Sequence, residues 1–472
     1  MGSRVEPSLT PEPRPLPRSL GLLAVLFLTL SVITPASSVF VIVPGMLQSA
    51  GSGALWAMLI SGFVLVATAY IYAELSSAWP IAGGEYVMVA RTMGPAAGFA
   101  ILGVSVVNNV LFPPVAGLGI SAVLASVIPG LPQVPVAIAI VALATLCGLL
   151  NIRVNAWITG IFLAIELVAL AIVSVLVFAG PMRPLGELFL HPVMPSAGEL
   201  VPATPAAIGL ATTIGIFALN GCGTAVYFAE ELNEAPKQVA RAVLWALVLT
   251  LLSEGLPLLA VLAGAPDLKA LFLADDPFGA FVALRGGQTV ASIVAIGVAI
   301  AILNAAIAFL LACARFFYST ARDRSWGYPL DAWMQALHPR HASPWVATLI
   351  CGGVGVAACF LPMTLLLLLS GTGLIAVYAG IALAAIAGRR TGATAHAAYR
   401  MPFHPVAPFV TLAALAYIVF MNWQDLEEGR ISLIATGAQI LVSLVYYFLV
   451  LKRRGWHVHH SLGAVGAAPH KP

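Results

Sequence analysis

The sequence predicts an all-α integral membrane protein with twelve transmembrane helices, arranged as a 5+5 inverted repeat followed by two C-terminal helices. Three observations lead to this prediction. The chain has 472 residues, of which 60% are hydrophobic and only 9% charged. It contains a series of apolar segments of about the length that a bilayer requires, and its basic residues gather on one side of them. The first and sixth of these segments are interrupted at similar depth by helix-breaking residues.

The composition excludes a water-soluble protein. A soluble domain carries about 25% charged residues, far more than this chain offers. The mean hydropathy is +0.99, and the 43 Gly and 33 Pro are tolerated in membrane helices because neighbouring groups satisfy the freed backbone. The five cysteines lie in apolar stretches without the spacing of a metal site or a disulfide framework. We therefore expect a lipid bilayer as the main solvent, and no metal or cofactor.

A transmembrane helix needs about 20 mostly apolar residues, and the chain offers twelve candidate spans. They are 20–46, 54–77, 96–127, 135–150, 156–178, 206–228, 239–263, 290–317, 346–361, 364–386, 406–420 and 431–451. The segments expected from these spans are a disordered cytosolic tail at 1–19, a first five-helix repeat at 20–180, an inverted second repeat at 203–388, helices 11 and 12 at 400–454, and a cytosolic C-terminal tail at 455–472.

The basic residues predict the orientation. When the N-terminus is placed in the cytosol, all but four of the 22 Lys and Arg residues fall on the cytosolic side. The four on the outer side are Arg183, Lys269, Arg285 and Arg430. Cytosolic loops of membrane proteins carry such an excess of Lys and Arg. We therefore expect a multi-pass plasma membrane protein with both termini in the cytosol.

Two spans contain helix-breaking residues near their middle. The first is interrupted at 34–38, where Pro35 removes a backbone donor and clashes with the preceding turn. The sixth is interrupted at 220–223, where Gly221 and Gly223 weaken a helix by about 1 kcal/mol each. Because five spans separate the two starting points, the sixth span enters from the opposite side, as an inverted repeat requires. Ordinary kinks in continuous helices are the alternative, but the matching positions favour two broken helices.

Four segments resemble the amino acid–polyamine–organocation (APC) permeases. They are AELSSAWPIAGGEY at 73–86, FALNGCGTAVYFAEEL at 217–232, ARFFYSTARD at 314–323 and YRMPF at 399–403. With these motifs in order, the chain is similar to this superfamily, and to its bacterial-type amino acid permeases, from about residue 20 to residue 450. The resemblance implies a substrate cavity between helices one, three, six, eight and ten, and it implies amino acids or related amines as cargo.

Broken helices suit a zwitterionic substrate, because one half-helix presents free N–H groups to the carboxylate while carbonyl ends face the ammonium. The residues expected to bind substrate here are Ala36, Ser37 and Ser38 for the carboxylate, Phe217, Asn220 and Gly221 for the ammonium and side chain, and Cys222 and Gly223 for the wall. Many relatives have a Gly-Ser-Gly break in the first span, where this chain has Ala-Ser-Ser after a proline. The two serines have an alternative role, which is to hydrogen-bond their own helix.

Polar residues inside other spans are further candidates. Asn108 and Asn109 lie in the third span and Asn304 in the eighth. A buried amide in a membrane seeks a partner, so these residues either line the cavity or form helix–helix hydrogen bonds. Tyr378, in the tenth span, is a candidate gate.

Glu166 and Glu254 are the acids that lie well inside predicted spans, where an ionised side chain costs about 2.5–3.5 kcal/mol or more. Some APC carriers have a lysine near the position of Glu166 in place of a sodium ion. Glu166 is therefore a candidate for the coupling proton, with a neutral structural role as the alternative. Glu254 is a second coupling candidate, or it satisfies backbone groups freed by Pro257. The absence of Ser and Thr from 293–317 argues against sodium and leaves proton coupling or substrate exchange.

The predicted function is secondary active transport of amino acids by alternating access. Small or neutral zwitterions are favoured because helices one, three, six, eight and ten carry no acid mid-span. The alternatives are a carrier of polyamines or other cationic amines, a membrane-embedded sensor, and a transporter of the other large twelve-helix superfamily. No enzyme motif is present, and we expect no nucleic acid partner. The expected partners are the amino acid, the bilayer and, with proton coupling, protons.

Overall fold

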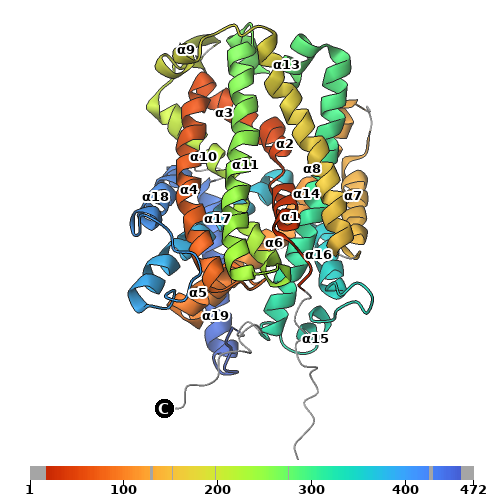
Figure 1. The fold of residues 1–472 in the computed structure, drawn as a ribbon, viewed down its shortest axis with the longest axis vertical. Helices are drawn as coiled ribbons and strands as arrows, with labels where there is room; N and C mark the ends of the chain where they lie inside the picture. The colour runs from red at the N-terminus through yellow and green to blue at the C-terminus, as the bar shows by residue number, and fades with distance from the viewer. Residues whose placement is uncertain are drawn as a thin grey trace, which may run out of the picture.

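The computed structural model describes residues 18–127, 131–150, 152–196, 198–274, 276–424 and 429–458. Within these residues the chain forms a helical bundle (Figure 1) with one antiparallel hairpin, in which β1 (Val193–Ser196) pairs with β2 (Glu199–Pro202). The predicted tails at 1–19 and 455–472 lie outside the described residues, apart from 18–19 and 455–458.

The helical elements follow one another along the whole chain. In order they are α1 (Leu22–Ile33), α2 (Pro35–Ser37), the π-helix η1 (Ser38–Ile42), α3 (Val43–Ala50), η2 (Gly51–Gly53), α4 (Ala54–Ala78), α5 (Glu85–Met93), α6 (Pro95–Val127), α7 (Gln133–Gly148), α8 (Ile152–Val175), η3 (Leu176–Ala179), α9 (Leu185–Leu190), α10 (Pro205–Ala218), the 3₁₀ helix η4 (Cys222–Glu231), α11 (Ala235–Gly264), α12 (Leu268–Leu273), α13 (Pro277–Gly286), α14 (Gln288–Arg322), α15 (Leu330–Met334), α16 (Trp345–Ala358), α17 (Met363–Thr391), α18 (Val406–Gln424), α19 (Gly429–Tyr446) and η5 (Tyr447–Leu451). In Figure 1 the short helices α9 and α13 lie at one end of the bundle and α15 at the other.

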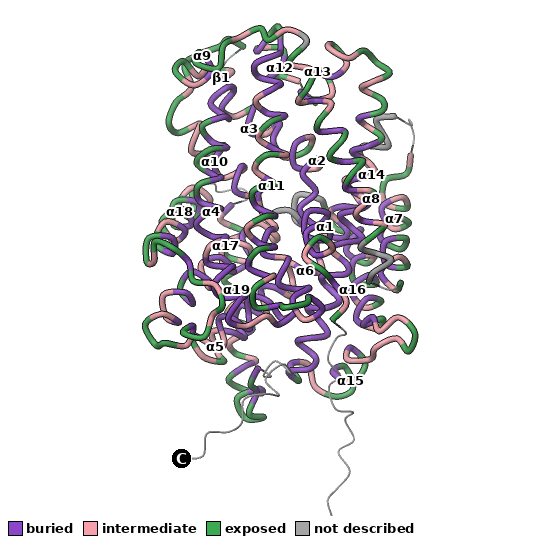
Figure 2. Tube along the Cα trace, in the orientation of Figure 1, coloured by how far each residue is buried: buried purple, intermediate pink, exposed green. Residues whose placement is uncertain are grey.

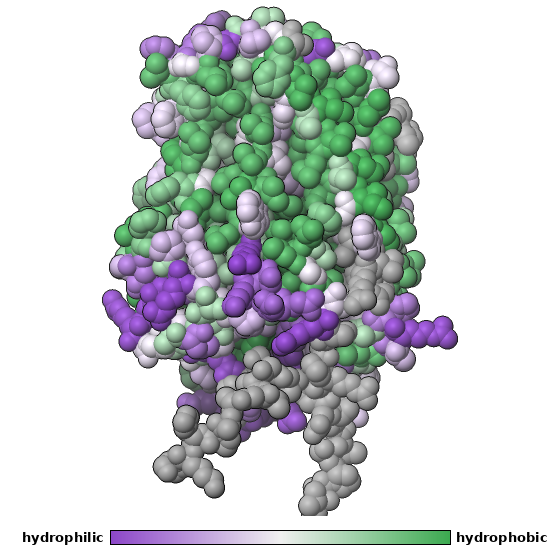
Figure 3. All heavy atoms as spheres, in the orientation of Figure 1, coloured by the Kyte–Doolittle hydropathy of each residue, from purple (hydrophilic) through white to green (hydrophobic). Residues whose placement is uncertain are grey.

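The outer surface of the bundle is apolar. In the described part of the chain, nine stretches are long and apolar enough to cross a membrane, and the first of them, Leu22–Ala78, contains α1 to α4. The helices α7 and α16 are apolar but shorter. Figure 3 shows hydrophobic residues forming a broad belt, with hydrophilic residues gathered below it. Large apolar side chains such as Trp157 and Leu441 are exposed, which suits contact with lipid. The protein is therefore an integral membrane protein.

The first predicted interruption coincides with the end of α1. This helix stops at Ile33, and Thr34 adopts the left-handed conformation with φ 49°. Pro35 then begins α2, which gives way to η1 after Ser37. The proline ring explains the break, because it disfavours the right-handed helical conformation in the residue before it.

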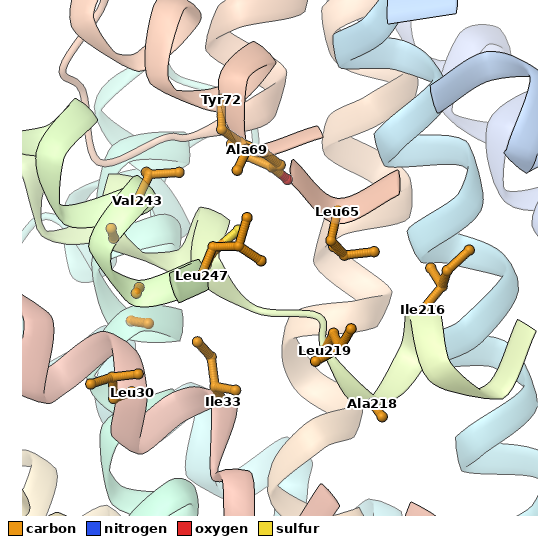
Figure 4. Packing of buried hydrophobic residues seen from close by; sticks show 14 of the residues in the cluster. Leu30, Ile33, Leu65, Ala69, Tyr72, Ile216, Ala218, Leu219, Val243 and Leu247 are labelled. Atoms are coloured by element: carbon orange, nitrogen blue, oxygen red, sulfur yellow. The ribbon is translucent and has the colours of Figure 1, made fainter. Parts of the chain in front are cut away.

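The second interruption follows α10. This helix stops at Ala218, and the chain runs through a short non-helical link before η4 begins at Cys222. Gly221, in the link, has φ 126°, a conformation that glycine adopts without the steric cost of a Cβ. Figure 4 shows Ala218 at the end of α10 and Leu219 at the start of this link, among buried apolar residues of α1, α4 and α11.

The two interruptions are in contact with each other. The Ser38 hydroxyl donates to the carbonyl oxygen of Ala218 at 3.0 Å, across 180 residues of sequence. A Cβ atom built on Gly221 would lie 2.7 Å from Cγ1 of Ile33, which leaves no room for a side chain. Figure 2 shows that the chain around these breaks is largely buried. A backbone group freed inside a bilayer has no water to bind, so the Ala218 carbonyl of the second break depends on Ser38 of the first for a partner.

At the opposite end from α9 and α13, buried ion pairs fasten η4 to α14. Arg315 contacts Glu231 at 3.1 Å, and each side chain is only 1% exposed. Arg322 contacts Glu230 at 2.6 Å. The backbone N–H of Leu20 also donates to the carbonyl oxygen of Glu231 at 2.9 Å, which holds the start of the first span against the end of η4.

Replacing Gly221 by Ala tests the contact between the breaks. The added Cβ meets Ile33 and is forced into a strained backbone region, so we expect the variant to lose about 1–3 kcal/mol of stability. The measurement is equilibrium unfolding in mixed micelles. Gly255→Ala is the control, because nothing lies within 4 Å of the added Cβ in helix α11. Equal stability of the two variants would contradict the proposed contact.

Replacing Arg315 by Met tests the buried ion pair. The substitution leaves the Glu231 carboxylate buried without its cation, and we expect a loss of about 3–5 kcal/mol in the same unfolding measurement. Lys269→Met is the control, because Lys269 and Glu199 form an exposed pair worth less than about 1 kcal/mol. If both substitutions cost the same, the buried pair does not stabilise this end of the bundle.

Candidate substrate-binding site

A cavity of about 570 Å³ lies where the two interrupted helices meet. Its lining comes from the end of α1, from α2 and η1, from α10 and η4, and from α6, α14 and α17. The resemblance implies the same set of helices, namely one, three, six, eight and ten. Further lining residues come from helices outside this set, including Tyr72 of α4 and Glu85 of α5.

Most of the residues expected from the sequence to bind substrate lie on the cavity wall. They are Ser37, Ser38, Asn108, Asn109, Phe217, Asn220, Gly221 and Gly223. The candidate gate, Tyr378, also lines the cavity, and its hydroxyl bonds to the side-chain oxygen of Asn220. The structure thus brings polar groups of both breaks together with two amides of α6.

Three other predicted residues do not line the cavity. The backbone N–H of Ala36 donates to Oε1 of Glu166 at 2.7 Å, so this donor is already engaged rather than free for a carboxylate. The amide nitrogen of Asn304 bonds to Oγ of Ser31 at 2.8 Å and thereby ties α14 to α1. This geometry fits the helix–helix alternative for Asn304. Cys222 is buried at the start of η4.

Glu166 and Glu254 are both fully buried, behind the first interruption. Glu166 binds Ala36, as described above, and Glu254 lies near Ser38 and Glu166. Among the described residues, no hydrogen bond of good geometry reaches Oε2 of Glu166 or either oxygen of Glu254, although the hydroxyls of Thr34 and Ser38 lie close to these two carboxyls. A buried carboxylate without a full set of partners is costly, so this pair is suited to holding a proton.

A further carboxyl group, Glu85, lines one end of the cavity. Oε1 of Glu85 accepts a hydrogen bond from Tyr72 at 2.9 Å, and Oε2 accepts one from Tyr227 at 2.9 Å. Gly84 has φ 66° and packs against the Tyr227 ring, which leaves no space for a Cβ at that position. Burial raises the pKa of the Glu85 carboxyl, and the hydrogen bonds from the two phenols oppose this effect.

Glu85 and its two tyrosines were not among the residues predicted from the sequence. The acids considered there were those inside the predicted spans, whereas Glu85 begins the short helix α5 between two spans. The sequence feature that marks Glu85 as a candidate is its position directly after two glycines, in the GGEY motif at 83–86. Among the described residues, no group of three or more His, Cys, Asp or Glu residues is placed to hold a metal ion.

Comparison with known proteins identifies the family. The family described as Amino acid permease matches residues 20–450. The chain is 28% identical to an uncharacterized transporter of Mycobacterium tuberculosis over 73% of its own length and 75% of that protein. It is 23% identical to the branched-chain amino acid permease of Bacillus subtilis over 93% of its own length and 94% of that protein. It is 27% identical to the human Asc-type amino acid transporter 1 over 72% of its own length and 65% of that protein.

These relatives are named as transporters, and the family match runs from residue 20 to residue 450. They confirm the resemblance that the motifs suggest and make the protein a membrane transporter rather than an enzyme. The chain belongs to the amino acid permease family, within the amino acid–polyamine–organocation superfamily.

Proposed function

We propose that this protein is a secondary active transporter that carries amino acids across the plasma membrane by alternating access. The observation that carries the proposal is the cavity of about 570 Å³ bounded by two interrupted helices. Interrupted helices of this kind can offer backbone donors and acceptors to a zwitterion without requiring ionised side chains at the breaks. The names of the bacterial and human relatives favour amino acids as cargo.

We further propose twelve transmembrane helices in a 5+5 inverted repeat, with two additional helices at the C-terminal end. Several observations support this layout. The 57-residue stretch Leu22–Ala78 accommodates two spans, and α7 and α16 are apolar helices that fit the remaining places. The two interruptions occupy corresponding positions in spans one and six. The end of the bundle that carries α15 is then cytosolic, together with both termini.

The substrate carboxylate is proposed to bind at Ser37 and Ser38, where the Ser38 hydroxyl must first release the Ala218 carbonyl, and the ammonium at Phe217, Asn220 and Gly221. Their position on the cavity wall supports this assignment. The preference for neutral cargo rested on the lack of acids in helices one, three, six, eight and ten. Glu85 reaches the cavity from a different helix, so a carboxyl group is present there for cationic cargo.

Glu166 is proposed to carry the coupling proton, with substrate exchange as the alternative mode. Its bond to the N–H of Ala36 connects its protonation state to the geometry of the first break. When Glu166 is charged, it holds this backbone donor strongly. When it is protonated, the hydrogen bond weakens, because charge-assisted hydrogen bonds are roughly twice as strong as neutral ones. Proton uptake therefore changes how tightly the break is held.

The transport function is tested by uptake into proteoliposomes that contain the full chain. We expect counterflow of a radiolabelled amino acid that is competed by a subset of the twenty amino acids, with empty liposomes as the control. A pH gradient across the membrane separates proton coupling from simple exchange. Failure of every amino acid and common polyamine to compete or accumulate would contradict the proposed function.

Glu166→Gln tests the coupling role. The amide keeps the shape of the side chain but cannot release a proton, so we expect accumulation driven by a pH gradient to be abolished while exchange of substrate continues. Glu187→Gln on α9 is the control, because it removes an exposed carboxylate far from the first break in sequence. Gradient-driven accumulation equal to that of the wild-type protein would exclude Glu166 as the proton carrier.

A further inference from the structure

One end of the substrate cavity carries a single formal charge. Of the residues that line the cavity in the described part of the chain, Glu85 is the one Asp, Glu, Lys, Arg or His. Its side chain is 6% exposed, and none of the ion pairs among the described residues includes it. Burying a carboxylate without a cation costs free energy. A cation can reach Glu85 from the cavity that this residue lines.

The hydrogen bonds around Glu85 fix it as an acceptor. Tyr72 and Tyr227 each have one phenolic proton, and each donates it to a different oxygen of the carboxylate. The phenol oxygens and the remaining lone pairs of Glu85 are then all acceptors. These bonds oppose the effect of burial, which raises the pKa of the Glu85 carboxyl, and a cation bound beside it would favour the ionised form further.

An independent observation points to a missing donor at the same place. The side-chain nitrogen of Asn109 bonds to the carbonyl oxygen of Ser105 at 2.8 Å and reaches the hydroxyl of Tyr227 at 3.5 Å. This orientation leaves Oδ1 of Asn109 buried without a hydrogen-bond partner, although the residue is only 3% exposed. Oδ1 of Asn108, also on the cavity wall, is buried and unpartnered as well. The site thus collects several acceptor oxygens, and the buried hydroxyl of Ser105 there is an unpartnered donor among the described residues.

Aromatic rings complete the surroundings of Glu85. Tyr72 and Tyr378 pack edge to face with ring centroids 5.9 Å apart, and Tyr227 joins them on the lining of the cavity. The face of a tyrosine ring attracts cations, and rings combined with a carboxylate recognise organic ammonium groups. An ammonium group also brings three N–H donors, which match the acceptors that the cluster offers.

We propose that Glu85, Tyr72, Tyr227 and Asn109 form a subsite for an ammonium group on the far end of the cargo, so that the carrier selects amino acids with a cationic amine side chain. This inference rests on the proposed function, because it assigns the chemistry of one end of the substrate cavity. Tyr378 links this end to the second break through its bond to Asn220 and its contact with Tyr72. The head group of the amino acid binds at the breaks, and its side-chain ammonium lies at Glu85.

The test compares matched pairs of ligands in proteoliposomes that contain the full chain. Lysine and norleucine differ by one side-chain ammonium, as do ornithine and norvaline. Competition against a transported label gives an inhibition constant for each ligand. We expect the wild-type protein to bind lysine and ornithine about ten- to a hundredfold more tightly than their uncharged counterparts, as a hydrogen bond to a charged group implies.

Two substitutions separate recognition from structural support. Glu85→Gln keeps the acceptor shape but removes the charge, so we expect the lysine-to-norleucine preference to fall to about one while norleucine affinity stays within a few-fold. Tyr227→Phe keeps the ring and removes one hydroxyl, so we expect a partial loss of the same preference. Glu187→Gln, which removes an exposed carboxylate on α9, should leave the preference unchanged. Melting curves in detergent confirm that each variant is folded.

The outcomes distinguish this inference from the proposed function. Equal affinity of the wild-type protein for lysine and norleucine would overturn the inference while leaving an amino acid carrier intact. An equal loss of affinity for both ligands in Glu85→Gln would assign Glu85 a structural role instead and would also overturn it. If no amino acid of either kind is bound or transported, the proposed function fails, and the subsite fails with it.

Discussion

The structure depends on one constraint, which is that backbone groups freed inside a bilayer must find partners within the protein. The helix ends at Ile33 and Ala218 create such groups in two spans. The Ser38 hydroxyl satisfies the carbonyl of Ala218, and the Glu166 carboxylate satisfies the N–H of Ala36. The breaks are therefore stable because they lie against each other and against α8. The polar groups on the largely apolar wall of the cavity follow from the same arrangement.

The ion pairs at the end of η4 hold this helix against α14, at the end of the bundle opposite α9 and α13. Arg315 and Glu231 form a buried ion pair. The backbone N–H of Leu20, at the start of the first span, donates to the carbonyl oxygen of Glu231. The two interrupted spans are thus joined twice, once at their breaks and once at this end. In the proposed alternating-access mechanism one of these connections is released, and charged groups that exchange a buried partner for water are suited to such a step.

The sequence predicts features that depend on local chemistry better than features that depend on packing. Pro35 and Gly221 identify the two breaks because each acts on the local backbone, Pro35 on the residue before it and Gly221 on its own conformation. The sequence also places polar candidates on the correct spans, and most of them line the cavity. It does not reveal that Glu166 occupies the N–H of Ala36, or that Asn304 turns to Ser31, because these contacts join distant segments. Glu85 was missed for the same reason, since only tertiary packing brings α5 between Tyr72 and Tyr227.

The central claim is that the two breaks form one binding site for an amino acid. The most direct measurement is an experimental structure of the protein with a transported amino acid bound, determined in lipid nanodiscs. Our account predicts ligand density within the cavity, with its carboxylate beside Ser37 and Ser38 and its ammonium beside Asn220. Density outside the cavity, or contact with one broken helix and not with the other, would contradict it.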